Sequence, residues 1–138
     1  MATLDTGYVD GVRSIRDYPV KSGVTIAAND FVDLDSSGYL QPCSAGDIPF
    51  GVAVGAVTTA PTADGAQVCA VDTSDQSIYR FPPDAGAVAL TLLGKKMDTG
   101  GAQSVNIDAS TDGCLFARAV DVPANRVYVS LILLPVGV

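Results

Sequence analysis

Short runs of β-branched and aromatic residues, separated by turn residues, fill most of the chain. The clearest example is a run at 31–35, followed by Asp35-Ser36-Ser37-Gly38 and a second run at 39–41. Gly38 can take the positive φ that a tight hairpin turn needs, and Asp and Ser side chains hydrogen-bond the turn backbone. Residues 50–57 have almost no polar face, which predicts a strand buried on both sides.

The spacing of these runs predicts a mainly β fold, a small β-sandwich or barrel of about nine or ten short strands. Residues 90–93 permit either a strand or one helical turn, and the turn is preferred, so at most one short helix is expected. Thr99-Gly100-Gly101 is expected to be a turn between two strands. The predicted strands are 24–27, 31–35, 39–41, 50–57, 67–72, 77–81, 95–97, 104–108, 114–120 and 126–134.

Residues 1–20 differ from the rest, because their apolar side chains are scattered and follow neither a helical nor a strand period. We expect an extended N-terminal arm, ahead of a single β domain at residues 21–138. A disordered leader is the alternative, but leaving these side chains in water costs about 25 cal/mol per Å² of apolar surface. The arm is therefore expected to dock on a neighbouring subunit, through Tyr8, Val9, Val12, Ile15 and Tyr18.

Two parts of the chain share a similar order of residues. Residues 32–40 align with 105–115 when a small insertion is allowed before the glycine, and residues 64–71 align with 123–130. An internal duplication would explain this similarity. Chance reuse of Val, Gly and Asp in β-hairpins would explain it equally well, so both interpretations stay open.

Composition narrows the possible functions. All fifteen acidic residues are Asp, there is no Glu, and the 138 residues carry a net charge of −7. The few cations are spread along the chain, so nucleic acid is not expected as a partner. No apolar run is long enough for a membrane span, and no signal peptide is expected, because acidic residues come early and no basic-then-apolar pattern is present. Three widely spaced cysteines, Cys43, Cys69 and Cys114, indicate reduced thiols and synthesis in a cytoplasm.

Residue types also argue against an enzyme. The chain has no His, which removes the commonest general base, the commonest metal ligand and every Ser-His or Cys-His pair. Residues 33–38 and 108–113 match the first half of an EF-hand loop. Position 12 is Ser44 or Ala119 instead of a bidentate carboxylate, so Asp-rich turns are the preferred interpretation. No catalytic residue, cofactor or metal is expected.

A pattern of hydrophobics and glycines recurs in a fixed order over roughly residues 20 to 135. The segments that carry it are residues 23–32, 38–40, 48–53, 92–97, 113–115 and 127–131. This order resembles the head-decoration, or capsid cement, proteins of tailed bacteriophages. The resemblance implies a non-enzymatic virion protein that is made in the host cytoplasm and binds the outer capsid surface, a homotrimer that clamps neighbouring major capsid subunits.

Two other functions remain as alternatives to the capsid protein. A β-sandwich module that binds a glycan or receptor, as in a phage fibre or surface adhesin, would need a concave site with aromatic platforms. Five Tyr and four Phe leave that open, although the chain has no Trp. A hydrolase would need two paired Asp side chains, and no spacing in the sequence singles out such a pair.

Overall fold

The structure of the protein is a computed structural model that describes residues 6–132. Within them, 11 strands form two antiparallel sheets and the single helical element is a 3-10 turn, which confirms the predicted mainly β class. In chain order the elements are β1 (Gly7–Asp10), β2 (Ile15–Pro19), β3 (Phe31–Leu34), β4 (Leu40–Pro42), β5 (Gly51–Ala53), β6 (Val68–Asp72), β7 (Ile78–Phe81), η1 (Leu90–Leu92), β8 (Lys96–Gly101), β9 (Ser104–Asn106), β10 (Leu115–Asp121) and β11 (Arg126–Leu131).

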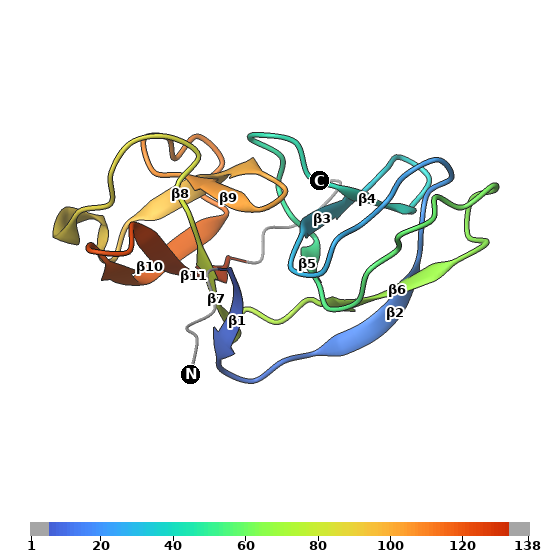
Figure 1. Ribbon diagram of the computed structural model, residues 1–138, viewed down its shortest axis with the longest axis horizontal. Coiled ribbons are helices and arrows are strands. Elements are labelled where there is room, and N and C mark those ends of the chain that lie inside the picture. Colours follow the sequence, from blue (N-terminus) through green and yellow to red (C-terminus); the bar gives the residue numbers. More distant parts are fainter. Residues whose placement is uncertain (1–5, 133–138) are drawn as a thin grey trace.

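The two sheets lie side by side along the long axis of the molecule (Figure 1). The six-stranded sheet has the order β1-β7-β11-β10-β8-β9, and the five-stranded sheet has the order β2-β6-β5-β3-β4. Consecutive strands β6 and β7 belong to different sheets, as do β1 and β2. Two short segments of the chain, one between each of these pairs, therefore cross from one sheet to the other.

Each sheet has its own apolar core, and β3 and β5 serve both of them. Phe31 and Val52 belong to the core of the six-stranded sheet, whereas Val32 and Ala53 belong to the second core. This division follows from the alternation of side chains along a strand, which places neighbouring residues on opposite faces. The near-continuous apolar sequence of β5 is thus explained by burial on both faces.

Local geometry explains two differences from the predicted strands. Residues 24–27 form no strand, because only Ile26 bridges to Val57 before the chain turns at Asn29, where φ is 73°. β8 continues through Thr99-Gly100-Gly101, where a turn was expected, and the register shifts there. A Cβ at Gly100 would lie 2.6 Å from Cβ of Asp84, so this glycine permits a close approach to the neighbouring loop.

The described part of the expected arm is integrated into both sheets. β1 is an edge strand of the six-stranded sheet and pairs with β7, and β2 is an edge strand of the five-stranded sheet and pairs with β6. The connection between them runs along the lower side of Figure 1 from one sheet to the other. Residues 7–19 and the expected domain therefore share their sheets.

The strand order of one sheet repeats in the other. The five-stranded sheet has the order β2-β6-β5-β3-β4, and five strands of the six-stranded sheet have the order β7-β11-β10-β8-β9, so each run of five consecutive strands is arranged first, fifth, fourth, second, third. The similar residues 64–71 and 123–130 fall on the equivalent strands β6 and β11, whereas residues 32–40 and 105–115 fall on β3–β4 and β9–β10, which are not equivalent. The repeated topology therefore supports an internal duplication, although with a different alignment of the first pair of segments.

Candidate docking surfaces on the arm and beside β10

The connection between β1 and β2, residues 11–14, is fixed to the β6–β7 crossing by a group of hydrogen bonds around Asp72. Its Oδ1 accepts the backbone N–H groups of Ser14 and Ser74, each at 3.0 Å, and its Oδ2 accepts the hydroxyl of Tyr79 at 2.6 Å. Arg13 completes the group, because its Nε lies 3.5 Å from Asp72 Oδ2. The Arg13 guanidinium also lies over the ring of Tyr8, 4.1 Å from its centroid.

The hydrogen bonds to Asp72 keep its carboxylate ionised although the side chain is fully buried. Burial on its own would raise the pKa of Asp72, but the hydroxyls of Ser77 and Tyr79 and the two backbone N–H groups outweigh that effect and lower it. The pKa of the Tyr79 hydroxyl is raised, first by burial and then by its bond to this carboxylate. A buried charge with this many donors fixes the arm in one position.

Three of the five predicted interface residues are exposed on this fixed segment. Val9, Val12 and Ile15 are 46%, 75% and 47% exposed, and we call these three side chains the arm surface. Tyr8 and Tyr18 are half-buried against the chain itself. The ring of Tyr8 packs edge-on against Tyr79 with centroids 5.7 Å apart, and that of Tyr18 against Phe50 at 4.9 Å.

The outer face of β2 and β6 extends the apolar character around Ile15. Val68 lies on the face opposite its neighbour, the buried Cys69. Val68 pairs directly with Pro19 of β2, and Cys69 pairs with Tyr18. Ile15 lies on that same outer face, because it is an even number of residues from Pro19. Val68 is 58% exposed. The β2 end of the arm therefore presents Ile15 of the edge strand β2 and Val68 of the adjacent strand β6 on the same face of the sheet.

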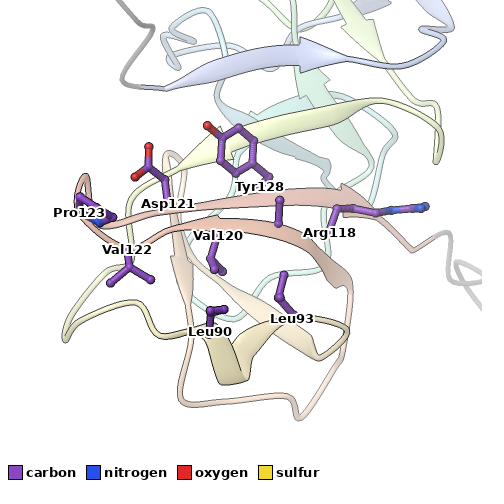
Figure 2. Close-up of a pocket in the computed structure, with 9 residues that line it drawn as sticks. Leu90, Leu93, Arg118, Val120, Asp121, Val122, Pro123 and Tyr128 are labelled. Atoms are coloured by element: carbon purple, nitrogen blue, oxygen red, sulfur yellow. The ribbon is translucent and has the colours of Figure 1, made fainter.

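A second exposed apolar region lies beside β10. It is a groove of about 520 Å³, and Figure 2 shows Leu90 and Leu93 of the η1 region facing Val120 and Val122 across it. Leu90, Leu93 and Val122 are all exposed. We call this region the β10 groove, and its lining residues are Leu90, Leu93, Arg118, Ala119, Val120, Asp121, Val122, Pro123 and Tyr128.

The β10 groove runs along a sheet edge whose backbone is only partly paired. β10 pairs with β11 over its whole length, but with β8 only through Leu115 and Phe116. Hydrogen bonds of Ala117 with the backbone of residues 94 and 95 extend this contact by one residue. Within residues 6–132, no strand pairs with this side of β10 at residues 119–121. Such an edge can accept an added strand.

The charged group that the β10 groove offers to a partner is a cation. Arg118 is exposed, and its Nε donates to the hydroxyl of Ser130 at 2.9 Å. Asp121 is already engaged, because Nη2 of the buried Arg80 lies 3.4 Å from its Oδ2. Arg118 also lines a neighbouring groove formed with Asp75, Phe116 and Leu131. An occupant with a carboxylate would therefore meet an available cation.

A third polar feature joins the loop between β4 and β5 to the six-stranded sheet. The Thr99 hydroxyl donates to the carbonyl oxygen of Asp47 at 2.7 Å, and the Gly46 N–H donates to the carbonyl oxygen of Thr99 at 2.9 Å. Burial raises the pKa of Asp33 to about 6, opposed by the amide of Gln41 and reinforced by the carboxylate of Asp47. The loop therefore places the Asp47 carboxylate beside Asp33, which favours the protonated form of Asp33.

The other candidate chemical groups serve the chain itself. Asp98 accepts the backbone N–H groups of Thr111, Asp112 and Gly113, so the Asp-rich loop at 108–113 surrounds a carboxylate of the protein. Asp35 accepts the N–H groups of residues 37 and 39 in its turn. The three cysteines are buried and free, and burial raises the pKa of the Cys114 thiol to about 11.

Comparison with known proteins identifies no relative. The chain matches no protein-family model, no curated protein and no solved structure. In the described residues, no three His, Cys, Asp or Glu side chains gather in a metal-binding group. None of the helices at positions 6–132 is long and apolar enough to cross a membrane. The function must therefore be argued from the two exposed surfaces.

The sequence drew attention to the arm but not to the β10 groove. The three exposed arm residues stood out because they follow no period in a segment with no expected core of its own. Leu90 and Leu93 fell in the segment that was ambiguous between strand and helix, and Val122 followed a predicted strand. Contact between η1 and β10 depends on tertiary structure, and only the excess of leucines at 90–93 hinted at it.

Proposed function

We propose that this chain is a structural virion protein that binds the outer surface of an icosahedral phage capsid and clamps neighbouring major capsid subunits. The arm surface carries the proposal. Val9, Val12 and Ile15 are exposed on a segment that the buried Asp72 network holds in place. Docking a fixed apolar surface costs little conformational entropy, which favours binding to a repeated protein lattice.

The edge position of the arm supports the same function. β1 and β2 each leave one side of their backbone unpaired within the described chain, so a neighbouring strand can add to either sheet. The buried carboxylates Asp72 and Asp98 are occupied by donors from the chain itself. Exposed apolar contacts and sheet edges are therefore the groups that this surface offers to a partner, and both suit a protein.

A glycan- or receptor-binding module is the alternative function, and the structure favours it less. Sugar platforms need exposed aromatic rings. In the described chain every Tyr and Phe side chain is buried or half-buried, including Tyr128 at the β10 groove. A glycan array separates the two functions, because the module would bind a defined sugar whereas a capsid protein would bind none.

The decisive experiment uses heads of the phage whose genome encodes this chain, purified without the protein. The wild-type protein is expected to co-sediment with these heads in a fixed, saturable ratio and to raise their resistance to heat. Ile15→Asp places a charge on the β2 end of the arm surface and should reduce binding at least tenfold. Ile48→Asp is the matched control, because Ile48 is similarly exposed but lies outside the arm. Absence of saturable binding by the wild-type protein would contradict the proposal.

A further inference from the structure

The chain carries two complementary surfaces that can serve a contact other than capsid binding. Eight large apolar side chains of the described residues are strongly exposed. Three form the arm surface and three line the β10 groove, so six of the eight belong to two regions. Concentration of exposed apolar side chains in patches marks sites where proteins associate.

We propose that the β1 end of the arm, with Val9, Asp10 and Val12, binds the β10 groove of a second copy of this chain. This contact divides the arm, because the β2 end with Ile15 and Val68 then remains for the capsid. The inference concerns self-association in solution and needs no capsid. Its division of the arm rests on the proposed function.

Backbone geometry supports this contact. β1 is an edge strand, and the side of it that faces away from β7 is unpaired in the part of the chain that the structure describes. The β10 groove likewise follows an unpaired edge at residues 119–121. Two such edges can hydrogen-bond with each other, and this joins the sheets of two copies. Leu90 and Leu93 then cover the apolar side chains of the incoming strand.

Opposite charges on the two surfaces favour the binding of the arm to the groove. Asp10 is exposed, and among the described residues its carboxylate accepts a local bond, from the Gly11 N–H at 2.8 Å. Arg118 is the available cation of the groove, because Arg80 engages the other lining charge, Asp121. A carboxylate on the incoming segment can therefore pair with the exposed Arg118 guanidinium, which lies at the end of the groove and points away from Leu90 and Leu93 (Figure 2), and this attraction acts despite the net charge of −7 on each copy.

The contact joins two different surfaces, so each copy can donate its arm and receive the arm of another. Contacts of this kind close into a ring when the rotation between copies permits it and otherwise extend into a filament. The Asp72 network holds the donated segment on its own chain, so association needs no release of β1. Copies therefore assemble as folded units.

Sedimentation velocity of the purified protein over a range of concentrations, without capsids, tests the contact. The wild-type mass should rise with concentration to a ring or a growing filament. Val12→Asp and Leu93→Asp should each weaken association at least tenfold. Ile48→Asp and Asp84→Lys are matched controls of exposed residues outside both surfaces and should change nothing. Far-UV circular dichroism confirms that each variant is folded.

A charge exchange tests the pairing itself. Asp10→Lys and Arg118→Asp should each weaken association about tenfold, and the two singly substituted proteins mixed together should regain it, as should the double variant. A wild-type protein that stays monomeric, or association that is unchanged by Val12→Asp and Leu93→Asp, would overturn the inference. A monomer that still saturates capsids leaves the proposed function intact, whereas a self-associating protein that ignores capsids contradicts that function alone.

Discussion

The hydroxyl of Tyr79 donates a 2.6 Å hydrogen bond to the buried carboxylate of Asp72, and this bond joins the two sheets. Asp72 ends β6 of the five-stranded sheet, and Tyr79 lies in β7 of the six-stranded sheet. The same carboxylate holds the connection between β1 and β2 through the Ser14 N–H. A single polar group thus sets the position of both sheets and of the arm.

Removing the Tyr79 hydroxyl should loosen this junction. Tyr79→Phe leaves a buried carboxylate with one donor fewer, so the free energy of unfolding should fall by about 1–2 kcal/mol. Urea denaturation measures this change. Tyr39→Phe, at a half-exposed tyrosine outside the junction, is the control and should be close to neutral. Equal stability of the two variants would show that the Asp72–Tyr79 bond contributes nothing.

Gly11 should tolerate no side chain. Its φ is +96°, and an added Cβ would collide with the carbonyl oxygen of Gln76. Gly38 has a similar φ of +88° but open space around it, so Gly38→Ala isolates the backbone penalty of about 1 kcal/mol. Gly11→Ala should lower stability by about 2–3 kcal/mol more, because the collision adds to that penalty.

Hydrogen exchange locates the effect of the Gly11 substitution. Amides of β1 and β2 should lose protection in Gly11→Ala and keep it in Gly38→Ala. Uniform loss of protection across both sheets would instead show that the connection is not a separate unit of stability.

Stability should fall as the pH rises through the pKa of Asp33. The folded-state pKa of about 6 lies above the ordinary value of 3.8 for this carboxyl group, so the folded protein binds the proton more tightly. The resulting stabilisation is complete below about pH 4 and is lost as the pH rises through about 6. Asp33→Asn should remove this slope and stabilise the protein at neutral pH by about 1 kcal/mol, after allowance for solvent screening.

Thermal unfolding between pH 4 and pH 8 measures the slope. Asp84→Asn, at an exposed carboxyl group, is the control and should keep the wild-type dependence. The pKa of Asp72 is lowered, so its contribution to stability has the opposite pH dependence. That contribution is lost as the pH falls below the ordinary pKa of an aspartate. An identical slope in wild type and Asp33→Asn would exclude Asp33 as its source.

The Thr99 hydroxyl should stabilise the loop between β4 and β5. Thr99→Val keeps the shape of the buried side chain but removes the donor to the Asp47 carbonyl oxygen. We expect a loss of about 1 kcal/mol in the free energy of unfolding. Thr91→Val changes the same group at an exposed position of η1 and should alter stability little.

Local signals explain which elements the sequence could predict. The Asp35–Gly38 turn determines the β3–β4 hairpin, and Asp35 caps the turn as its side-chain chemistry suggested. The helical turn expected at 90–93 is present as η1. In each case the residues that interact are close in the chain, so composition and spacing were sufficient.

The arm and the groove depend on contacts between distant residues, which a single sequence does not reveal. β1 pairs with β7, some seventy residues away, and its register shifts between Tyr8 and Asp10, which breaks the alternation that marks a strand. Edge position also leaves Ile15 and the two residues after it exposed, so β2 lacks an apolar face. Docking of the five predicted arm residues on a partner stays a prediction.

The position of β1 and β2 has a consequence for biosynthesis. Both strands are translated before their pairing partners β6 and β7, which follow only after some fifty further residues, and β7 in turn pairs with β11. All strands of the five-stranded sheet are present once residue 72 has been translated, whereas the six-stranded sheet cannot be completed before β11. Closure of the six-stranded sheet should therefore be the later and slower step.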